Sequence, residues 1–215
     1  MIEKKLHFIW IGDESKRPDN CIDTWREKNP DYEVKVWGNE HLRSYNWHLD
    51  EWMRAMGPRE LCGVADLMRF EILWREGGIT LDADSICIRP LEDWLLETGE
   101  FAAWEGEHIM DTGLIGAGAL GAVKGSLFFE QIVKDFLAEE VVINDMAWIV
   151  TGPLRITNTW KKYRYPLTIY PSHYFYAWHH SGHVWKGPGI KFAKQLWGST
   201  HHTDTSYDTL HRETL

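Results

Sequence analysis

Two aspartates one residue apart, Asp82 and Asp84, are the residues of this chain best suited to chemistry. They follow the short apolar segment 79–81, which predicts a buried strand, and ligands of α/β sheets bind where strands end. In extended backbone, side chains two residues apart point to the same side. Carboxylates in such a place need a cation or strong donors. The pair therefore predicts a site for Mg²⁺ or Mn²⁺, completed by phosphate oxygens of a substrate.

A second charged pair, Asp66 and Arg69, lies on the helix expected over residues 60–76. Apolar residues recur there at helical spacing, and Gly77 is placed to end the helix. Residues three apart share one face of a helix. Such a pair is most often an exposed ion pair, but its place directly upstream of the aspartates favours a role in binding substrate.

Trp10 stands near the end of the apolar run 6–12, which closes on Gly12. A near-continuous apolar run of this length predicts the buried first strand of a parallel sheet. At that edge the flat indole would offer a stacking surface for a nucleobase. The alternative role is packing in the core, which we expect for most of the 13 tryptophans.

Expected strands and helices alternate along the chain, with no internal repeat and no low-complexity linker. The strands are expected at 6–12, 32–37, 79–81, 86–88, 101–104, 111–115 and 167–170, and the helices at 21–28, 40–55, 60–76 and 126–139. This alternation predicts an α/β fold with a mainly parallel sheet. We expect one domain over residues 1–215, with a polar, flexible tail at 200–215.

Bulk composition excludes several classes of function. A net charge of −9 and a pI near 5.6 argue against binding to nucleic acid or to an anionic membrane surface. The three cysteines are widely spaced, so we expect neither a zinc motif nor a disulfide framework, and a reducing, cytoplasmic location. The N-terminal apolar run is too short for a signal peptide or a membrane span.

Two further patterns carry less information. Residues 116–121 match GxGxxG, but a dinucleotide-binding motif should follow the first strand and open a helix, whereas the next helix is expected only near 126. We interpret this segment as flexible backbone that lets a substrate approach. Five histidines, namely His179, His180, His183, His201 and His202, offer metal ligands, although a single histidine is usually structural or exposed.

Three segments in this order, His7–Gly12, Ala65–Arg69 and Gly77–Asp84, resemble the DXD-containing glycosyltransferases of family 32. That family includes fungal initiating mannosyltransferases and bacterial capsular-polysaccharide sugar transferases. The segments are also similar to the glucosyltransferase domains of clostridial toxins. The resemblance covers the first ~95 residues and continues more faintly at 151–153 and 197–199. It implies a GT-A fold, with a Rossmann-like, mainly parallel sheet flanked by helices.

The resemblance also implies roles for individual residues. Trp10, with Ile9 beside it, would hold the nucleotide base. Asp66 and Arg69 would contact the sugar and phosphates of the donor. Asp82 would contact the donor and assist the metal.

Asp84 would be the main metal ligand by the same resemblance, and the metal would be Mn²⁺ or Mg²⁺. Asp111 lies where relatives carry a polar segment that contacts the sugar, so we count it among the catalytic candidates. Two positions depart from the family pattern. Thr80 replaces an aromatic residue, and Gln195 replaces a histidine that helps to hold the metal. The third metal ligand is left open among Ser199, His201 and His202.

These features predict a metal-dependent glycosyltransferase of polysaccharide biosynthesis. It would move a hexose from a nucleotide-diphosphate sugar, with UDP favoured, to a glycan or other hydroxyl acceptor, with retention at the anomeric carbon. Should a covalent nucleophile be needed, Asp111 and Asp145 are the candidates. The alternative is a sugar-nucleotide-binding protein that is non-catalytic or only hydrolyses its donor. A phosphatase of the haloacid-dehalogenase type is disfavoured, because it needs an acidic pair and no Asp-Asp occurs.

Overall fold

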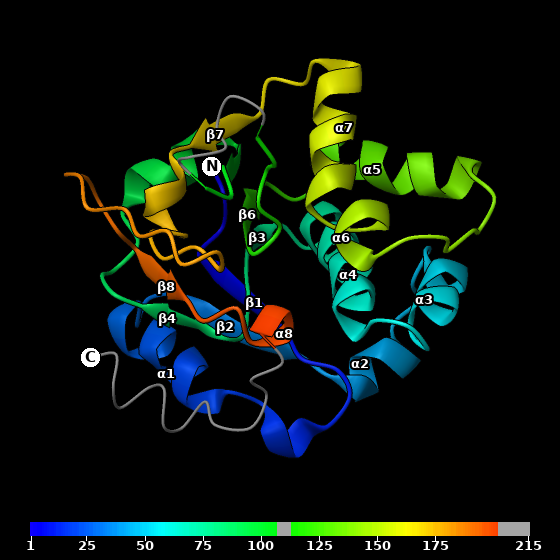
Figure 1. The fold of residues 1–215 in the computed structure, drawn as a ribbon, viewed down its shortest axis with the longest axis horizontal. Helices are drawn as coiled ribbons and strands as arrows, with labels where there is room; N and C mark the ends of the chain where they lie inside the picture. The colour runs from blue at the N-terminus through cyan, green and yellow to red at the C-terminus, as the bar shows by residue number, and fades with distance from the viewer. Residues whose placement is uncertain (107–112, 202–215) are drawn as a thin grey trace.

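The computed structural model describes residues 1–106 and 113–201 and shows an α/β architecture (Figure 1). Its main sheet has six strands in the order β2-β1-β3-β6-β5-β7. They span β1 Lys5–Ile9, β2 Glu33–Trp37, β3 Gly78–Leu81, β5 Glu100–Ala103, β6 Ala119–Ala122 and β7 Thr168–Tyr170. The β1/β2, β1/β3 and β5/β7 pairs are parallel, and β6 is antiparallel to both of its neighbours. The expected α/β fold with a mainly parallel sheet is confirmed.

Helices cover both faces of this sheet (Figure 1). They are α1 Asp19–Lys28, α2 Asn39–Ser44, α3 Asp50–Met56, α4 Leu61–Arg75, α5 Leu127–Ala138, α6 Ala147–Val150, α7 Pro153–Tyr163 and α8 Gly198–His201, with short 3-10 turns η1 Glu14–Lys16, η2 Asp93–Thr98 and η4 Ser172–Tyr174. Alternate strand residues enter opposite cores, because side chains alternate along a strand. Ala102 packs with α3, α4 and α5, whereas Phe101 and Ala103 pack on the side of α1.

Helix α4 crosses the interior, which explains why its sequence is apolar on more than one face. Only the first two residues, Ala65 and the last turn retain exposure, and even Glu71 is fully buried. The Glu71 carboxylate accepts the backbone N–H groups of His48 and Leu49 at 2.9 and 2.8 Å. It thereby holds the loop between α2 and α3, where the sequence had led us to expect one continuous helix over 40–55.

A second, two-stranded sheet brings a segment near the end of the described chain beside the segment that follows the aspartate pair. Strand β4, Ser85–Cys87, pairs antiparallel with β8, Ala193–Gln195, and places Ser85 opposite Gln195. The sequence analysis missed β8, because three residues carry too little periodicity to be recognised. Helix α7 was missed as well.

Two expectations for the middle of the chain need correction. The segment 116–121 is not flexible backbone throughout: its second half forms β6, which lies between β3 and β5. The strand expected at 111–115 is not found in its described part, where Ile115 makes a single bridge to Trp104. Residues 111 and 112 lie outside the described residues. Across residues 1–106 and 113–201, we find no helix with the length and apolarity needed to cross a bilayer.

We expect Glu71→Ala to lower the free energy of unfolding by about 3 kcal/mol, because two backbone N–H groups lose their acceptor and each costs about 1–3 kcal/mol. Urea unfolding monitored by circular dichroism measures this. Glu27→Ala, an exposed change on α1, should stay within about 0.5 kcal/mol of wild type. Equal losses in the two variants would contradict the role assigned to Glu71.

Candidate functional site

The aspartate pair lies in a tight turn between β3 and β4. The Asp82 backbone N–H donates to the Gly118 carbonyl at 2.9 Å, which ties the turn to the start of β6. Ser85 donates its N–H and its hydroxyl to the Asp82 carbonyl, at 3.1 and 2.7 Å. The backbone of both aspartates is therefore fixed by hydrogen bonds to the sheet and within the turn.

The two carboxylates face a common point, although the backbone between them is a turn and not the extended segment that we expected. The Gln195 side-chain amide donates to Asp82 Oδ2 at 3.1 Å and to Asp84 Oδ1 at 2.8 Å. The Gly198 N–H donates to Asp84 Oδ2 at 2.6 Å. Burial of Asp84 and the nearby Asp82 raise the pKa of Asp84 to about 6, although the donors from Gln195 and Gly198 oppose this.

Arg69 joins helix α4 to this turn. Its guanidinium is buried, and it donates to Asp66 at 3.2 Å, to Asp82 at 2.5 Å and to the Ala117 carbonyl. Burial disfavours the charge, but Asp82 and Asp66 hold the pKa of Arg69 above its ordinary value. Asp66 and Arg69 are therefore not an exposed ion pair, which is the commoner arrangement for two such residues on a helix. They are part of the wall of the site.

Glycines make room for these side chains. A Cβ atom on Gly118 would lie 2.3 Å from Asp82 Oδ2, and one on Gly152 would lie 2.9 Å from Asp66 Oδ2. The GxGxxG pattern thus allows a carboxylate to approach the backbone closely, and no helix follows it directly to make a dinucleotide site. Gly152 belongs to the Thr151–Pro153 segment singled out in the sequence.

A cavity of about 880 Å³ opens over the turn. Six of the seven predicted site residues line it, namely Ile9, Trp10, Asp66, Arg69, Asp82 and Asp84. Trp10 follows β1 and donates its indole N–H to the Asp13 carbonyl at 2.9 Å, which orients the ring at the rim. A cavity of this size is large enough for a nucleotide-sized ligand.

Of the other candidates, Asp145 has a described side chain, and it does not line this cavity. Asp111 lies outside the described residues. Asp145 is exposed and accepts the N–H of the next residue, Met146, at 2.8 Å. The third metal ligand was left open among Ser199, His201 and His202. The structure does not describe the side chains of Ser199 and His201, nor any part of His202. The position between the carboxylates is taken by Gln195.

Two other cavity residues, Glu105 and Tyr176, were not predicted. They line the same cavity as the aspartates, as does Trp197 from the segment 197–199 noted in the sequence. Tyr176 is buried, and its pKa is raised well above the ordinary value by that burial and by Asp82. Glu105 carried one signal that we could have used, because it directly follows an expected strand.

The residues around the turn fit a hard divalent cation. Asp82 and Asp84 offer carboxylate oxygens that converge, and such cations prefer oxygen ligands. The Gln195 amide has an oxygen as well as its donor, so a rotation about its last bond would present a neutral third oxygen. The chemistry available is the binding of a metal-bound, phosphate-bearing ligand beside an arginine.

Comparison with known proteins agrees with this geometry. Residues 15–100 match the family described as a glycosyltransferase sugar-binding region containing a DXD motif. We call residues 15–100 the DXD region, after the family that they match. The DXD region contains Asp66, Arg69 and both aspartates of the turn, so the family motif and the convergent side chains coincide.

Similarity extends beyond the DXD region. Inositol phosphoceramide mannosyltransferase 3 of Schizosaccharomyces pombe is 28% identical over 202 residues, which cover 90% of this chain and 48% of that protein. The chain thus spans about half the length of this relative.

Two solved structures share the fold. PaToxG glycosyltransferase has a TM-score of 0.56 at 17% identity and covers 75% of this chain and 70% of its own. A glycosyltransferase involved in glycosylation of the major capsid of PBCV-1 has a TM-score of 0.53 at 12% identity, with coverage of 95% and 98%. The expected GT-A fold is confirmed.

We expect Asp66→Asn to raise the melting temperature at pH 8 and to change it less at pH 4. Burial raises the pKa of Asp66 to about 7, whereas an unfolded aspartate titrates near 4. Between about pH 4 and pH 7, the folded state therefore keeps a proton that the unfolded chain releases. The stability that the protonated Asp66 contributes at low pH is lost as the pH rises through 7. The asparagine carries no such proton.

Melting temperatures measured at both pH values by differential scanning fluorimetry test this. Asp23→Asn, at an exposed site on α1, should give the same small effect at pH 4 and pH 8. A melting temperature for Asp66→Asn below that of wild type at pH 8 would contradict the prediction.

Proposed function

We propose that this chain is a metal-dependent glycosyltransferase that moves a hexose from a nucleotide-diphosphate sugar to a hydroxyl acceptor. The observation that carries the proposal is the convergence of Asp82, Asp84 and Arg69 on one cavity. The match of residues 15–100 to the DXD region supports it. The three free cysteines are consistent with a cytoplasmic location.

The chain's own residues would act as follows. A divalent cation, when bound by Asp84 and Asp82, supplies Lewis-acid stabilisation of a departing diphosphate. Arg69 holds Asp82 in place and puts a fixed positive charge at the wall of the cavity, where negative charge develops as the glycosidic bond breaks. Trp10, which lines the same cavity, offers its ring to the base. Because Gly118 has no side chain, the Asp82 carboxylate fits against its backbone and stays within reach of these groups.

Retention follows if the acceptor attacks on the face that the diphosphate leaves. The leaving phosphate would then accept the acceptor's proton, and no covalent nucleophile is needed. The geometry favours this route over a nucleophile at Asp145, because that residue is exposed and its carboxylate accepts the backbone N–H of Met146.

For the donor we propose a UDP sugar. The S. pombe relative is named an inositol phosphoceramide mannosyltransferase. A mannose donor is therefore the main alternative to the proposed UDP sugar. The acceptor would be a glycan or another hydroxyl compound.

The first experiment measures thermal shifts with UDP and GDP sugars, with and without Mn²⁺, on wild type and Asp84→Asn. At a ligand concentration 100 times the dissociation constant, binding adds about 2.7 kcal/mol to stability. We expect a Mn²⁺-dependent shift with one nucleotide family, and its loss in Asp84→Asn. Asp23→Asn is the matched control and should keep the shift.

Release of free sugar from the donor, measured without acceptor, separates the alternatives. Nucleotide binding with hydrolysis but no transfer would identify a donor hydrolase. Binding without either reaction would identify a non-catalytic binding protein. No shift with any nucleotide would contradict the proposal.

We expect Arg69→Lys to lower kcat by about 100-fold or more. The guanidinium donates to three acceptors at once, and a lysine ammonium is a point charge without that fork. Loss of a positioned donor to the transition state typically costs 10²–10³ in kcat. Steady-state kinetics with the donor found above measure the effect, and a variant with wild-type kcat would show that Arg69 is structural only.

A further inference from the structure

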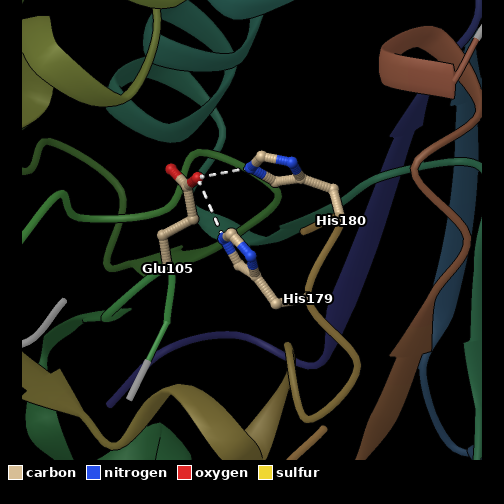
Figure 2. A group of neighbouring side chains, drawn as sticks. All are labelled: Glu105, His179 and His180. Carbon is tan, nitrogen blue, oxygen red and sulfur yellow. Dashed lines mark ion pairs between the residues drawn. The ribbon is translucent and has the colours of Figure 1, made fainter. Parts of the chain in front are cut away.

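A second group of ligating side chains lies in the same cavity as the DXD turn. Glu105 follows the end of β5, and His179 and His180 come from the loop after Tyr176; Figure 2 shows the three side chains pointing toward one another. The Nε2 atoms of His179 and His180 lie 3.5 and 3.6 Å from the same oxygen, Glu105 Oε1. The ligand atoms of all three lie within 4.8 Å of one another.

These separations suit ligands around an ion. They are longer than an N–H···O hydrogen bond, which is usually near 2.9–3.0 Å. Ligands held about 2.1 Å from an ion in tetrahedral geometry lie about 3.4 Å apart. We propose that Glu105, His179 and His180 bind a transition-metal cation of the Zn²⁺ class, at a site separate from the DXD turn.

The choice of ion follows from the donor atoms. Two imidazoles and one carboxylate suit Zn²⁺ and Co²⁺, whereas Mg²⁺ and Mn²⁺ favour all-oxygen sites such as the aspartate pair. Three protein ligands that face a cavity leave a fourth position for water or for a group of a substrate. A hydroxyl or anionic group of the acceptor would have the right chemistry for that position.

The backbone holds these side chains in place. Glu105 donates its N–H to the Leu114 carbonyl at 3.0 Å, next to the Trp104–Ile115 bridge. His179 donates its N–H to the His183 carbonyl at 2.9 Å, and Gly182 donates back to the His179 carbonyl at the same distance. The ligands therefore sit on a closed turn and a strand end, so a cation would need little reorganisation to bind.

The tautomer of His179 decides whether its Nε2 can bind a metal. The Ser181 hydroxyl lies 2.8 Å from His179 Nδ1. When Nδ1–H donates to that hydroxyl, the Nε2 lone pair points at Glu105, and outer-shell acceptors of this kind accompany most metal-bound histidines. If Nδ1 instead accepts the Ser181 N–H, 3.2 Å away, a proton on Nε2 would make the cluster a plain carboxylate–imidazole contact. The experiment below separates the two.

Electrostatics also favour a cation here. Glu105 is only 9% exposed, and burial raises the pKa of its carboxyl group to about 7. A divalent cation would offset that burial and keep the carboxylate ionised.

Trp197 connects the cluster to the DXD turn. Both imidazole rings lie against Trp197, with ring centroids 5.4 and 5.1 Å away. Trp197 has an unusual left-handed backbone, with φ of 59°, and directly precedes Gly198, whose N–H binds Asp84. An ion at the cluster would therefore order the segment that holds the main DXD carboxylate. This inference stands on the cluster itself and does not depend on the proposed transfer activity.

The test is Zn²⁺ titration by calorimetry of the full chain, purified without a histidine tag and stripped with chelator. Co²⁺ absorption spectra report on the ligands. We expect one Zn²⁺ site in wild type, with Co²⁺ giving the visible spectrum of a nitrogen- and oxygen-ligated tetrahedral ion. His180→Ala, His179→Ala and Glu105→Gln should each weaken Zn²⁺ binding by about 100-fold or more, since even outer-shell losses cost roughly 10–100-fold.

Two controls make the result specific. His183→Ala removes an exposed imidazole from the same turn and should leave Zn²⁺ affinity unchanged. Asp84→Asn should abolish Mn²⁺-dependent nucleotide binding but keep the Zn²⁺ site, so failure of this inference and failure of the proposed function give different results. His180 is half-exposed, so its variant should fold, as circular dichroism would verify. Absence of Zn²⁺ binding in wild type, or equal affinity in wild type and His180→Ala, would overturn the assignment.

Discussion

The buried guanidinium of Arg69 is the interaction on which the site depends. It ties three separate parts of the chain together: Asp66 on its own helix, Asp82 at the end of β3 and the carbonyl of Ala117 before β6. A buried arginine is stable only when its donors find charged or carbonyl acceptors, because an unpaired charge there costs several kcal/mol. The same requirement fixes where α4 lies against the edge of the sheet.

The sheet is arranged so that these partners meet. Parallel pairing of β1 with β3 brings Trp10 and Asp82 to one edge, while antiparallel β6 delivers the glycine-rich segment to the same edge. Small residues there are a geometric necessity, since a side chain on Gly118 would collide with the Asp82 carboxylate. The short β4/β8 pair then closes the site from the far end of the described chain.

Negative charge is concentrated in this cavity. Asp66, Asp84 and Glu105 are all buried, and burial raises the pKa of each. Such a cavity is costly to the folded protein without cations and becomes favourable when cations bind. The protein thus gives up stability at the point where it binds its ligands, as expected when a site is built for charged species.

Sequence alone determined the segment from α4 to the DXD turn, because its information is local. Helical periodicity, a Gly-Gly stop and a short apolar strand placed Asp66, Arg69, Asp82 and Asp84 within one continuous stretch, and helical spacing put Asp66 and Arg69 on one face. Only the tertiary structure decided which distant groups complete the site. Gln195 reaches the aspartates through a three-residue strand, and Glu105 meets the histidines across more than seventy residues. Such contacts have no periodic signature, since their free energy comes from packing and desolvation in the folded state.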